Sequence, residues 1–204
     1  MQAEKTHRSR RIPPKRYRKA TPEEYLEFEY KAERKNEYVT GEIRPMSYTS
    51  ENHGLLVANL IGLLFNGLKG RNCRVYPSDR MLHVPETGNF YYPDVMVVCG
   101  DSEFFQYKQR MQATLNPTVL IEVLSETTSD YDETIKWHSY KRIKTLQQYI
   151  RVHQNLMLLE LYTRVGNSND WLNTEAELPD QTVLIGGCTV KVSEVYEHVA
   201  LVKK

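Results

Sequence analysis

The chain has 204 residues, 40% of them apolar, and its 27 basic side chains nearly balance 26 acidic ones. A chain of this length forms one domain of ordinary size and buries a substantial core. The composition argues against disorder beyond the N-terminus, and the longest apolar stretch, residues 54–65, is too short to span a bilayer.

The charge is unevenly distributed along the chain. The first 20 residues carry a formal charge of +7 and the remainder carries −6. We therefore expect a basic, flexible arm over residues 1–20, followed by one domain over residues 21–204. The arm either contacts an anionic partner or is a solvated tail. No apolar segment follows it, which excludes a secretory signal and favours a cytoplasmic protein.

Two helices and a hairpin are predicted in the first third of the chain. Thr21, Pro22 and Glu24 form a capping box that starts the first helix. Ser50 caps the second helix, whose broad leucine-rich face predicts burial. The expected bounds are a helix over residues 21–35, a hairpin over 37–46 and a helix over 50–70.

The middle of the chain is rich in strands, and helices and strands alternate after it. The continuous apolar run of residues 118–125 is typical of a strand that is buried on both faces. The polar segment before it is compatible with a helix. We predict strands over residues 73–77, 79–85, 90–98 and 118–125, a helix over 132–143, a hairpin of 149–154 with 156–164, and then shorter C-terminal strands and a short helix over 193–198. The pattern predicts a mixed α/β (α+β) fold with a central mixed sheet and flanking helices.

The common signatures of cofactor and metal chemistry are absent from the sequence. It contains no P-loop, no dinucleotide-binding glycine motif and no zinc-protease or nucleophile-elbow motif. The six histidines show no metal-ligand spacing, so zinc is not expected. Cys73, Cys99 and Cys188 are widely spaced, and we interpret them as reduced core thiols.

Two carboxylates interrupt strands that are otherwise apolar. Asp94 follows Pro93 within the segment 90–98, and Glu122 lies within the segment 118–125. Two buried acids on adjacent strands repel one another unless a cation or a proton lies between them. Mg²⁺ commonly binds one or two carboxylates together with substrate phosphate. The pair therefore indicates a divalent-cation site, although an acid bonded to backbone amides or a structural ion pair is an alternative for each.

A lysine on the next predicted helix extends this arrangement. Lys136 follows Glu122 by fourteen residues and is placed to face the strand ends. An ammonium group there orients an attacking water or neutralises charge in the transition state. Lys141, Arg142 and Lys144 continue the basic run and either steer nucleic acid or form a solvated helix face.

The ordered set of these residues resembles the PD-(D/E)XK nuclease superfamily, and within it the Uma family of restriction endonucleases. The matching features span roughly residues 21–200: Glu37-Tyr-Val-x-Gly, His53, Pro93-Asp94, Glu122-Val-Leu-Ser, Lys136, Tyr140 and the Leu146-Gln-x-Tyr149 run. The resemblance implies a restriction-endonuclease-like core. It also implies Mg²⁺ or Mn²⁺ held by Asp94, Glu122 and the Val123 carbonyl, with Glu37 and His53 as further site residues.

The chain departs from the superfamily pattern at one position. The third motif position, usually the lysine of E-x-K, is Leu124 here, so Lys136 has to serve from the helix. Our leading interpretation is a metal-dependent DNA endonuclease, which as a homodimer would cut both strands. The alternatives are a nuclease-fold module that binds nucleic acid or a partner protein without cutting, and a phosphohydrolase that acts on small nucleotides.

Overall fold

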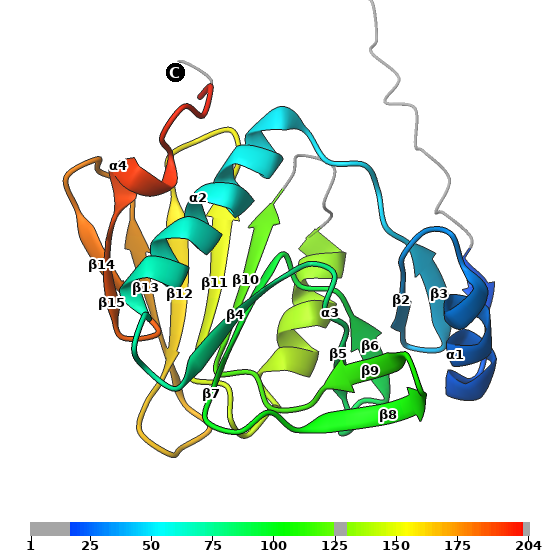
Figure 1. Ribbon diagram of the computed structural model, residues 1–204. Coiled ribbons are helices and arrows are strands. Elements are labelled where there is room, and N and C mark those ends of the chain that lie inside the picture. Colours follow the sequence, from blue (N-terminus) through cyan, green and yellow to red (C-terminus); the bar gives the residue numbers. More distant parts are fainter. Residues whose placement is uncertain (1–16, 125–129, 202–204) are drawn as a thin grey trace, which may run out of the picture.

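The computed structural model describes residues 17–124 and 130–201, with side chains omitted for residues 130–133. Two large β-sheets, a two-stranded sheet and four helices make up this part of the chain. Figure 1 shows helix α2 (Glu51–Gly67) in front of one sheet and helix α3 (Asp130–Tyr140) behind it. The second sheet lies to one side with helix α1 (Pro22–Lys31). The mixed α/β fold with helices on the faces of a mixed sheet is thus confirmed.

A six-stranded mixed sheet forms the centre of the molecule. Its strand order is β13-β12-β11-β10-β7-β4, and only the β10–β11 pair is parallel. Helix α3 connects these two strands, as a parallel pair requires a crossover. The bounds are β4 (Cys73–Pro77), β7 (Val95–Cys99), β10 (Val119–Leu124), β11 (Gln148–His153), β12 (Leu159–Arg164) and β13 (Trp171–Ala176).

The second sheet has seven short strands in the order β1-β3-β2-β6-β5-β9-β8. A smaller hairpin of β14 and β15, followed by the short helix α4, completes the fold. The bounds are β1 (Arg18–Lys19), β2 (Asn36–Val39), β3 (Glu42–Pro45), β5 (Leu82–Val84), β6 (Asn89–Tyr91), β8 (Phe104–Lys108), β9 (Met111–Thr114), β14 (Thr182–Ile185), β15 (Cys188–Lys191) and α4 (Val192–Val195).

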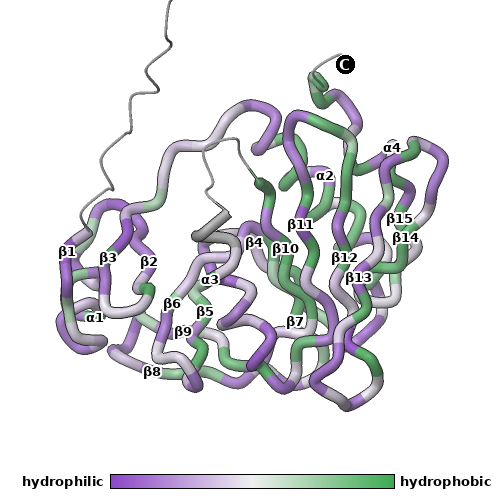
Figure 2. Tube along the Cα trace, turned by 180° about the vertical axis from the view of Figure 1, so that it is seen from behind, coloured by the Kyte–Doolittle hydropathy of each residue, from purple (hydrophilic) through white to green (hydrophobic). Residues whose placement is uncertain are grey.

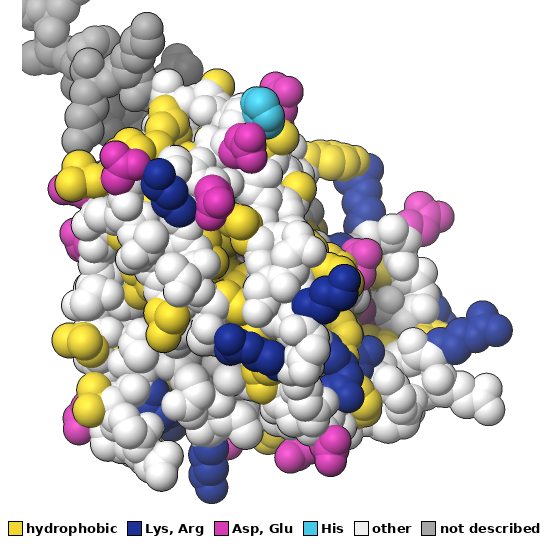
Figure 3. Space-filling model, turned by 60° about the vertical axis from the view of Figure 1, so that its left-hand side comes forward, with side chains coloured by type: hydrophobic (Ala, Val, Ile, Leu, Met, Phe, Trp, Pro, Cys, Tyr) yellow, Lys and Arg dark blue, Asp and Glu magenta, His cyan; other side chains and the backbone are white. Residues whose placement is uncertain are grey.

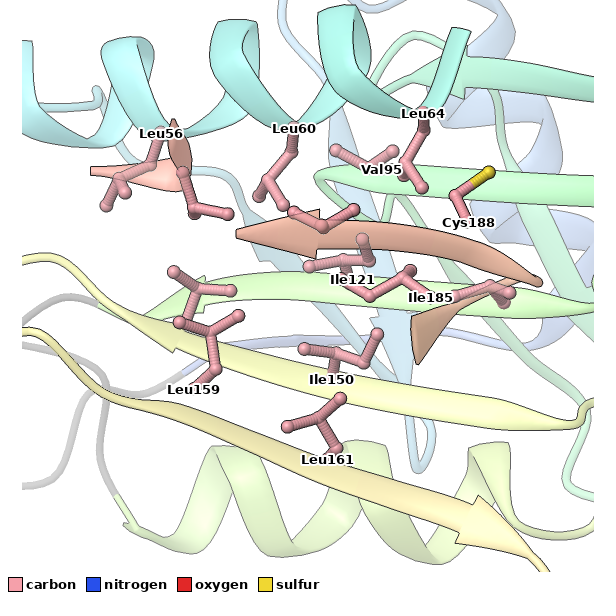
Figure 4. Close-up of a cluster of buried hydrophobic side chains, with 14 of the residues drawn as sticks. Leu56, Leu60, Leu64, Val95, Ile121, Ile150, Leu159, Leu161, Ile185 and Cys188 are labelled. Atoms are coloured by element: carbon pink, nitrogen blue, oxygen red, sulfur yellow. The ribbon is translucent and has the colours of Figure 1, made fainter. Parts of the chain in front are cut away.

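The main core lies between α2 and the central sheet. Leu56, Leu60 and Leu64 recur every fourth residue and point from α2 onto the strands (Figure 4). Ile121 and Ile150 meet them from β10 and β11, and the β14–β15 hairpin adds Ile185 and Cys188 to the same core. Figure 2 shows that hydrophobic residues concentrate along these central strands, whereas β1, β2, β3 and α1 are more hydrophilic.

Helix α3 lies between the two sheets. Its Tyr140 packs in one cluster with Leu120 and Tyr149 of the central sheet and with Val39 and Tyr91 of the seven-stranded sheet. A third cluster, which includes Tyr25 and Phe90, joins α1 to the opposite face of the seven-stranded sheet. Any polar side chain on the inner face of β2 is therefore held close to α3.

The predicted strand over residues 90–98 is divided in the structure. β6 and β7 belong to different sheets, and Pro93-Asp94 occupies the break between them. Proline has no N–H to donate to a ladder, so pairing stops there and the chain changes sheet. The polar segment before β10 is the β8–β9 hairpin and not a helix.

Other predicted boundaries need smaller corrections. Thr21 caps α1 with a complete capping box, but the helix ends at Lys31, and β2 begins four residues after its C-cap Ala32. Ser50 caps α2 as expected. The N-terminal arm was predicted over residues 1–20: residues 1–16 lie outside the described part, while Arg18 and Lys19 pair with β3.

The assignment of all three cysteines as reduced thiols is wrong. Cys73 and Cys99 form a disulfide, and only Cys188 is free. The two bonded residues stand directly opposite one another in the antiparallel β4–β7 pair. This proximity comes from strand register, which their spacing in the sequence does not reveal.

The molecular surface has no uniform charge on the side that Figure 3 presents. There Lys and Arg side chains are interspersed with Asp and Glu, and hydrophobic side chains show between them. Within the described residues, no helix combines the length and apolar character needed to cross a membrane.

Candidate active site

Strand β10 and helix α3 position the first part of the site. Ile121 and Val123 point toward α2, so Glu122 between them points toward α3. Lys136 and Tyr140 lie one turn apart on the facing side of the helix. The Lys136 ammonium lies 3.1 Å from both Glu122 carboxylate oxygens, and the Tyr140 hydroxyl donates to Oε1 at 2.7 Å.

Asp94 lies beside Glu122 because β7 is the antiparallel neighbour of β10. The register pairs Val95 with Ile121, which places Asp94 at the end of the ladder. The Val123 backbone N–H donates to Asp94 Oδ2 at 2.8 Å. His53 Nε2, from the first turn of α2, lies 3.2 Å from the same oxygen. The interruption between strands β6 and β7 at Pro93 thus places the Asp94 carboxylate between helix α2 and strand β10.

Glu37 joins the cluster from the seven-stranded sheet. It lies on the face of β2 that Val39 also uses to contact α3. Glu37 Oε1 lies 3.0 Å from the Lys136 ammonium and accepts the Tyr92 backbone N–H at 3.1 Å. Lys136 therefore bridges carboxylates from two different sheets.

The cluster carries more negative than positive groups. Burial raises the pKa of Glu122 to about 7, and the Asp94 and Glu37 carboxylates add to this against the opposing effect of Lys136. Burial disfavours the charged form of Lys136, but the three surrounding carboxylates outweigh it and hold its pKa well above the usual value. Burial and the Glu122 charge likewise raise the pKa of Tyr140. Such an excess of acid is stabilised by an added cation or by a proton.

The structure brings together all five side chains that the sequence singled out: Glu37, His53, Asp94, Glu122 and Lys136. Val123 contributes its N–H to the network. The remaining basic run does not join it, because Lys141 follows the last residue of α3, and Arg142 and Lys144 lie beyond it. Within the described part of the chain, no three His, Cys, Asp or Glu side chains have an arrangement that would hold a metal ion.

A second buried network next to the site was not predicted. The Glu29 carboxylate accepts the Asn36 backbone N–H at 3.0 Å and the Tyr92 hydroxyl at 3.0 Å, and the Asn36 side-chain amide at 2.9 Å. Asn36 precedes Glu37, and Tyr92 comes two residues before Asp94. The one available sequence signal was the position of these polar residues beside the motif residues.

Comparisons with known proteins identify related sequences and a family. A family model, Uma2, described as "Putative restriction endonuclease", matches residues 22–190. Two proteins of Synechocystis sp. are similar to the chain. One, sll1609, is 36% identical over 76% of this chain and 86% of its own length. The other, slr1290, is 31% identical over 92% of this chain and 97% of its own length.

A solved structure has a similar fold. It is described as a putative nuclease belonging to DUF820 from Anabaena variabilis. The TM-score is 0.70, with 15% sequence identity over 89% of this chain and 99% of that one. At this identity the likeness concerns the fold alone.

Proposed function

We propose that this chain, which belongs to the Uma2 family, is a metal-dependent endonuclease that hydrolyses phosphodiester bonds in DNA. The observation that carries the proposal is that Lys136 bridges Glu37 and Glu122 while Asp94 lies close enough for its charge to act on both Glu122 and Lys136. Three carboxylates and one lysine in a partly desolvated cluster match the requirements of metal-assisted hydrolysis.

The donor set fits a hard divalent cation. Mg²⁺ and Mn²⁺ prefer carboxylate and carbonyl oxygens as ligands. Because Mg²⁺ keeps several of its bound waters, two carboxylates are enough protein ligands to hold it. Asp94 and Glu122 would hold the cation, assisted by the main-chain carbonyl of Val123. When bound there, the cation would polarise a phosphate and lower the pKa of water.

The chain's own residues would perform the remaining tasks. Lys136, held between Glu37 and Glu122, would place its ammonium where negative charge develops on the phosphate oxygens. Glu37 and Tyr140 fix the directions of that ammonium and of Glu122. His53 would contact a phosphate or a water from the first turn of α2, with its ring oriented by Asp94. A homodimer would suit cleavage of both strands.

Plasmid nicking tests the proposal. The wild-type protein should nick supercoiled DNA with Mg²⁺ or Mn²⁺, and Asp94→Ala and Glu122→Ala should each lower the rate by at least about 100-fold. Asp170→Ala removes an exposed acid far along the chain and should leave the rate unchanged. Equal cleavage by all four proteins would identify a contaminating nuclease and refute the assignment.

A non-cleaving binding module is the second candidate. It is favoured by one observation: the carboxylates that would bind the metal already have protein partners. Lys136 and Tyr140 donate to Glu122, and the Val123 N–H and His53 contact Asp94 Oδ2. In that case DNA or a partner protein is retained while no protein in the set nicks the plasmid. Cleavage of small nucleotides with no effect on plasmid would instead support a phosphohydrolase.

A further inference from the structure

One aromatic side chain near the site is far more exposed than any other large apolar group of the described chain. Tyr48 is 83% exposed, and the Arg34 guanidinium lies 4.9 Å from its ring centre. The cation covers one face of the ring, so the other face is open to solvent. The open face of the ring is apolar surface that a flat ligand could cover.

Both members of this pair are anchored at the edge of the proposed site. The Asn36 side chain donates to the Arg34 carbonyl at 2.7 Å, and Arg34 precedes Glu37 by three residues. Tyr48 lies in the segment that joins β3 to α2, which spans the space between the two sheets in Figure 1. Two hydrogen bonds hold the ends of that segment. The Met46 backbone N–H donates to the Lys35 carbonyl, and the Ser50 hydroxyl donates to Gln154 Oε1.

Chain connectivity bounds the distance from this pair to the acidic cluster. Three residues span at most about 10 Å, so the Arg34 backbone lies within that distance of Glu37. Ser50, two residues after Tyr48, caps the helix turn that carries His53. The two members of the pair are therefore three and five residues along the chain from two side chains of the cluster, Glu37 and His53.

We propose that Tyr48 and Arg34 form a stacking platform for one unpaired base beside the scissile phosphate, an inference that rests on the proposed function. An exposed aromatic ring backed by a guanidinium stacks on any base, but only on one that has left the duplex stack. The substrate class is then nucleic acid that is single-stranded, frayed or flapped next to the cleaved bond.

Binding without cleavage tests this directly. The full-length protein in EDTA is titrated with fluorescein-labelled single-stranded DNA and with blunt duplex DNA of equal length, and anisotropy is followed. Wild type should prefer the single strand. Tyr48→Ala should weaken single-strand binding by roughly 5- to 150-fold, the range for one lost stacking contact, and leave duplex binding unchanged. Arg34→Ala should weaken it less, and Tyr48→Trp should preserve it.

Phe65→Ala is the matched control. Phe65 is 63% exposed on α2, twelve residues or about 18 Å beyond His53, and its removal should not alter binding. The inference is overturned if Tyr48→Ala binds like wild type, if it loses both ligands equally, or if wild type shows no preference for the single strand. Each of these results leaves the nicking test of Asp94 and Glu122 untouched, so the two proposals fail separately.

Discussion

The two faces of strand β2 carry two buried acid clusters of opposite character. Asn36 faces α1, where Glu29 receives hydrogen bonds from neutral donors only. Glu37, the next residue, faces α3 and shares one ammonium with Glu122. The Glu29 cluster is satisfied within the protein, whereas the Glu37 cluster has more acids than its own cation balances. An incompletely neutralised cluster of this kind is where a ligand adds most stability.

Removal of Lys136 should have the largest effect on stability and on nicking, and should show how the Glu37 cluster differs from the Glu29 cluster. Lys136→Met leaves three carboxylates without their shared cation, which should cost about 3–5 kcal/mol of folding free energy. Nicking per folded molecule should fall by at least about 100-fold. Chemical denaturation and plasmid assays measure the two effects. Lys141→Met, just beyond the helix end, is the control, and a stable and active Lys136→Met would remove the distinction between the clusters.

Loss of the Glu29 carboxylate should affect stability but not chemistry. Glu29→Ala deprives Asn36 and Tyr92 of their buried acceptor and should cost about 2–3 kcal/mol. The nicking rate of the folded fraction should remain within a few-fold of wild type. A collapse of the rate in protein shown by circular dichroism to be folded would place Glu29 in the functional machinery instead.

The hydrogen bond from Tyr140 to Glu122 should contribute less. Tyr140→Phe removes one donor to a buried carboxylate, at a cost of about 1.5 kcal/mol. Because this bond lowers the pKa of Glu122, its loss should raise that pKa further above about 7. Carboxyl-region NMR titration of the free protein measures the change. An unchanged titration would mean that burial and the neighbouring charges set the pKa of Glu122 without this hydrogen bond.

The smallest expected effect is a pH dependence from Glu29. Burial raises its pKa above the usual value, although hydrogen bonds from Asn36 and Tyr92 oppose this. A carboxyl with a raised folded-state pKa binds its proton more tightly when folded. The contribution of this proton to folding stability is complete below the unfolded-state pKa of about 4.5. It is lost as the pH rises through the higher folded-state pKa. Wild type should therefore gain stability relative to Glu29→Gln as pH falls toward 4.5. A difference that is flat with pH would contradict the burial argument.

The residues of the acidic cluster were accessible from sequence because their positions follow local rules. Asp94 and Glu122 interrupt apolar runs, and the spacing of Lys136 and Tyr140 places both on one helix face. The resemblance to a known family then ordered Glu37 and His53 with them. Only the geometry shows that Lys136 bridges two sheets, because this depends on how distant segments pack.

Other features could not be derived because they depend on register and on long-range pairing. The Cys73–Cys99 bond follows from the alignment of β4 with β7. The seven-stranded sheet was missed because its strands are short and Pro93 was placed inside one continuous strand. The Glu29 network was missed because a helix glutamate and a tyrosine far along the chain give no local pattern.

The bridge that Lys136 forms between the two sheets also has a consequence for the folding of the molecule. Glu37 and Glu122 lie on strands of different sheets, and Asp94 lies in the break between β6 and β7. Contacts between such distant parts of a chain form late and slowly in folding. The cluster is complete only when both sheets have docked on α3. Partly folded chains therefore lack the assembled acids. The proposed cleavage activity would therefore emerge only with the final tertiary structure.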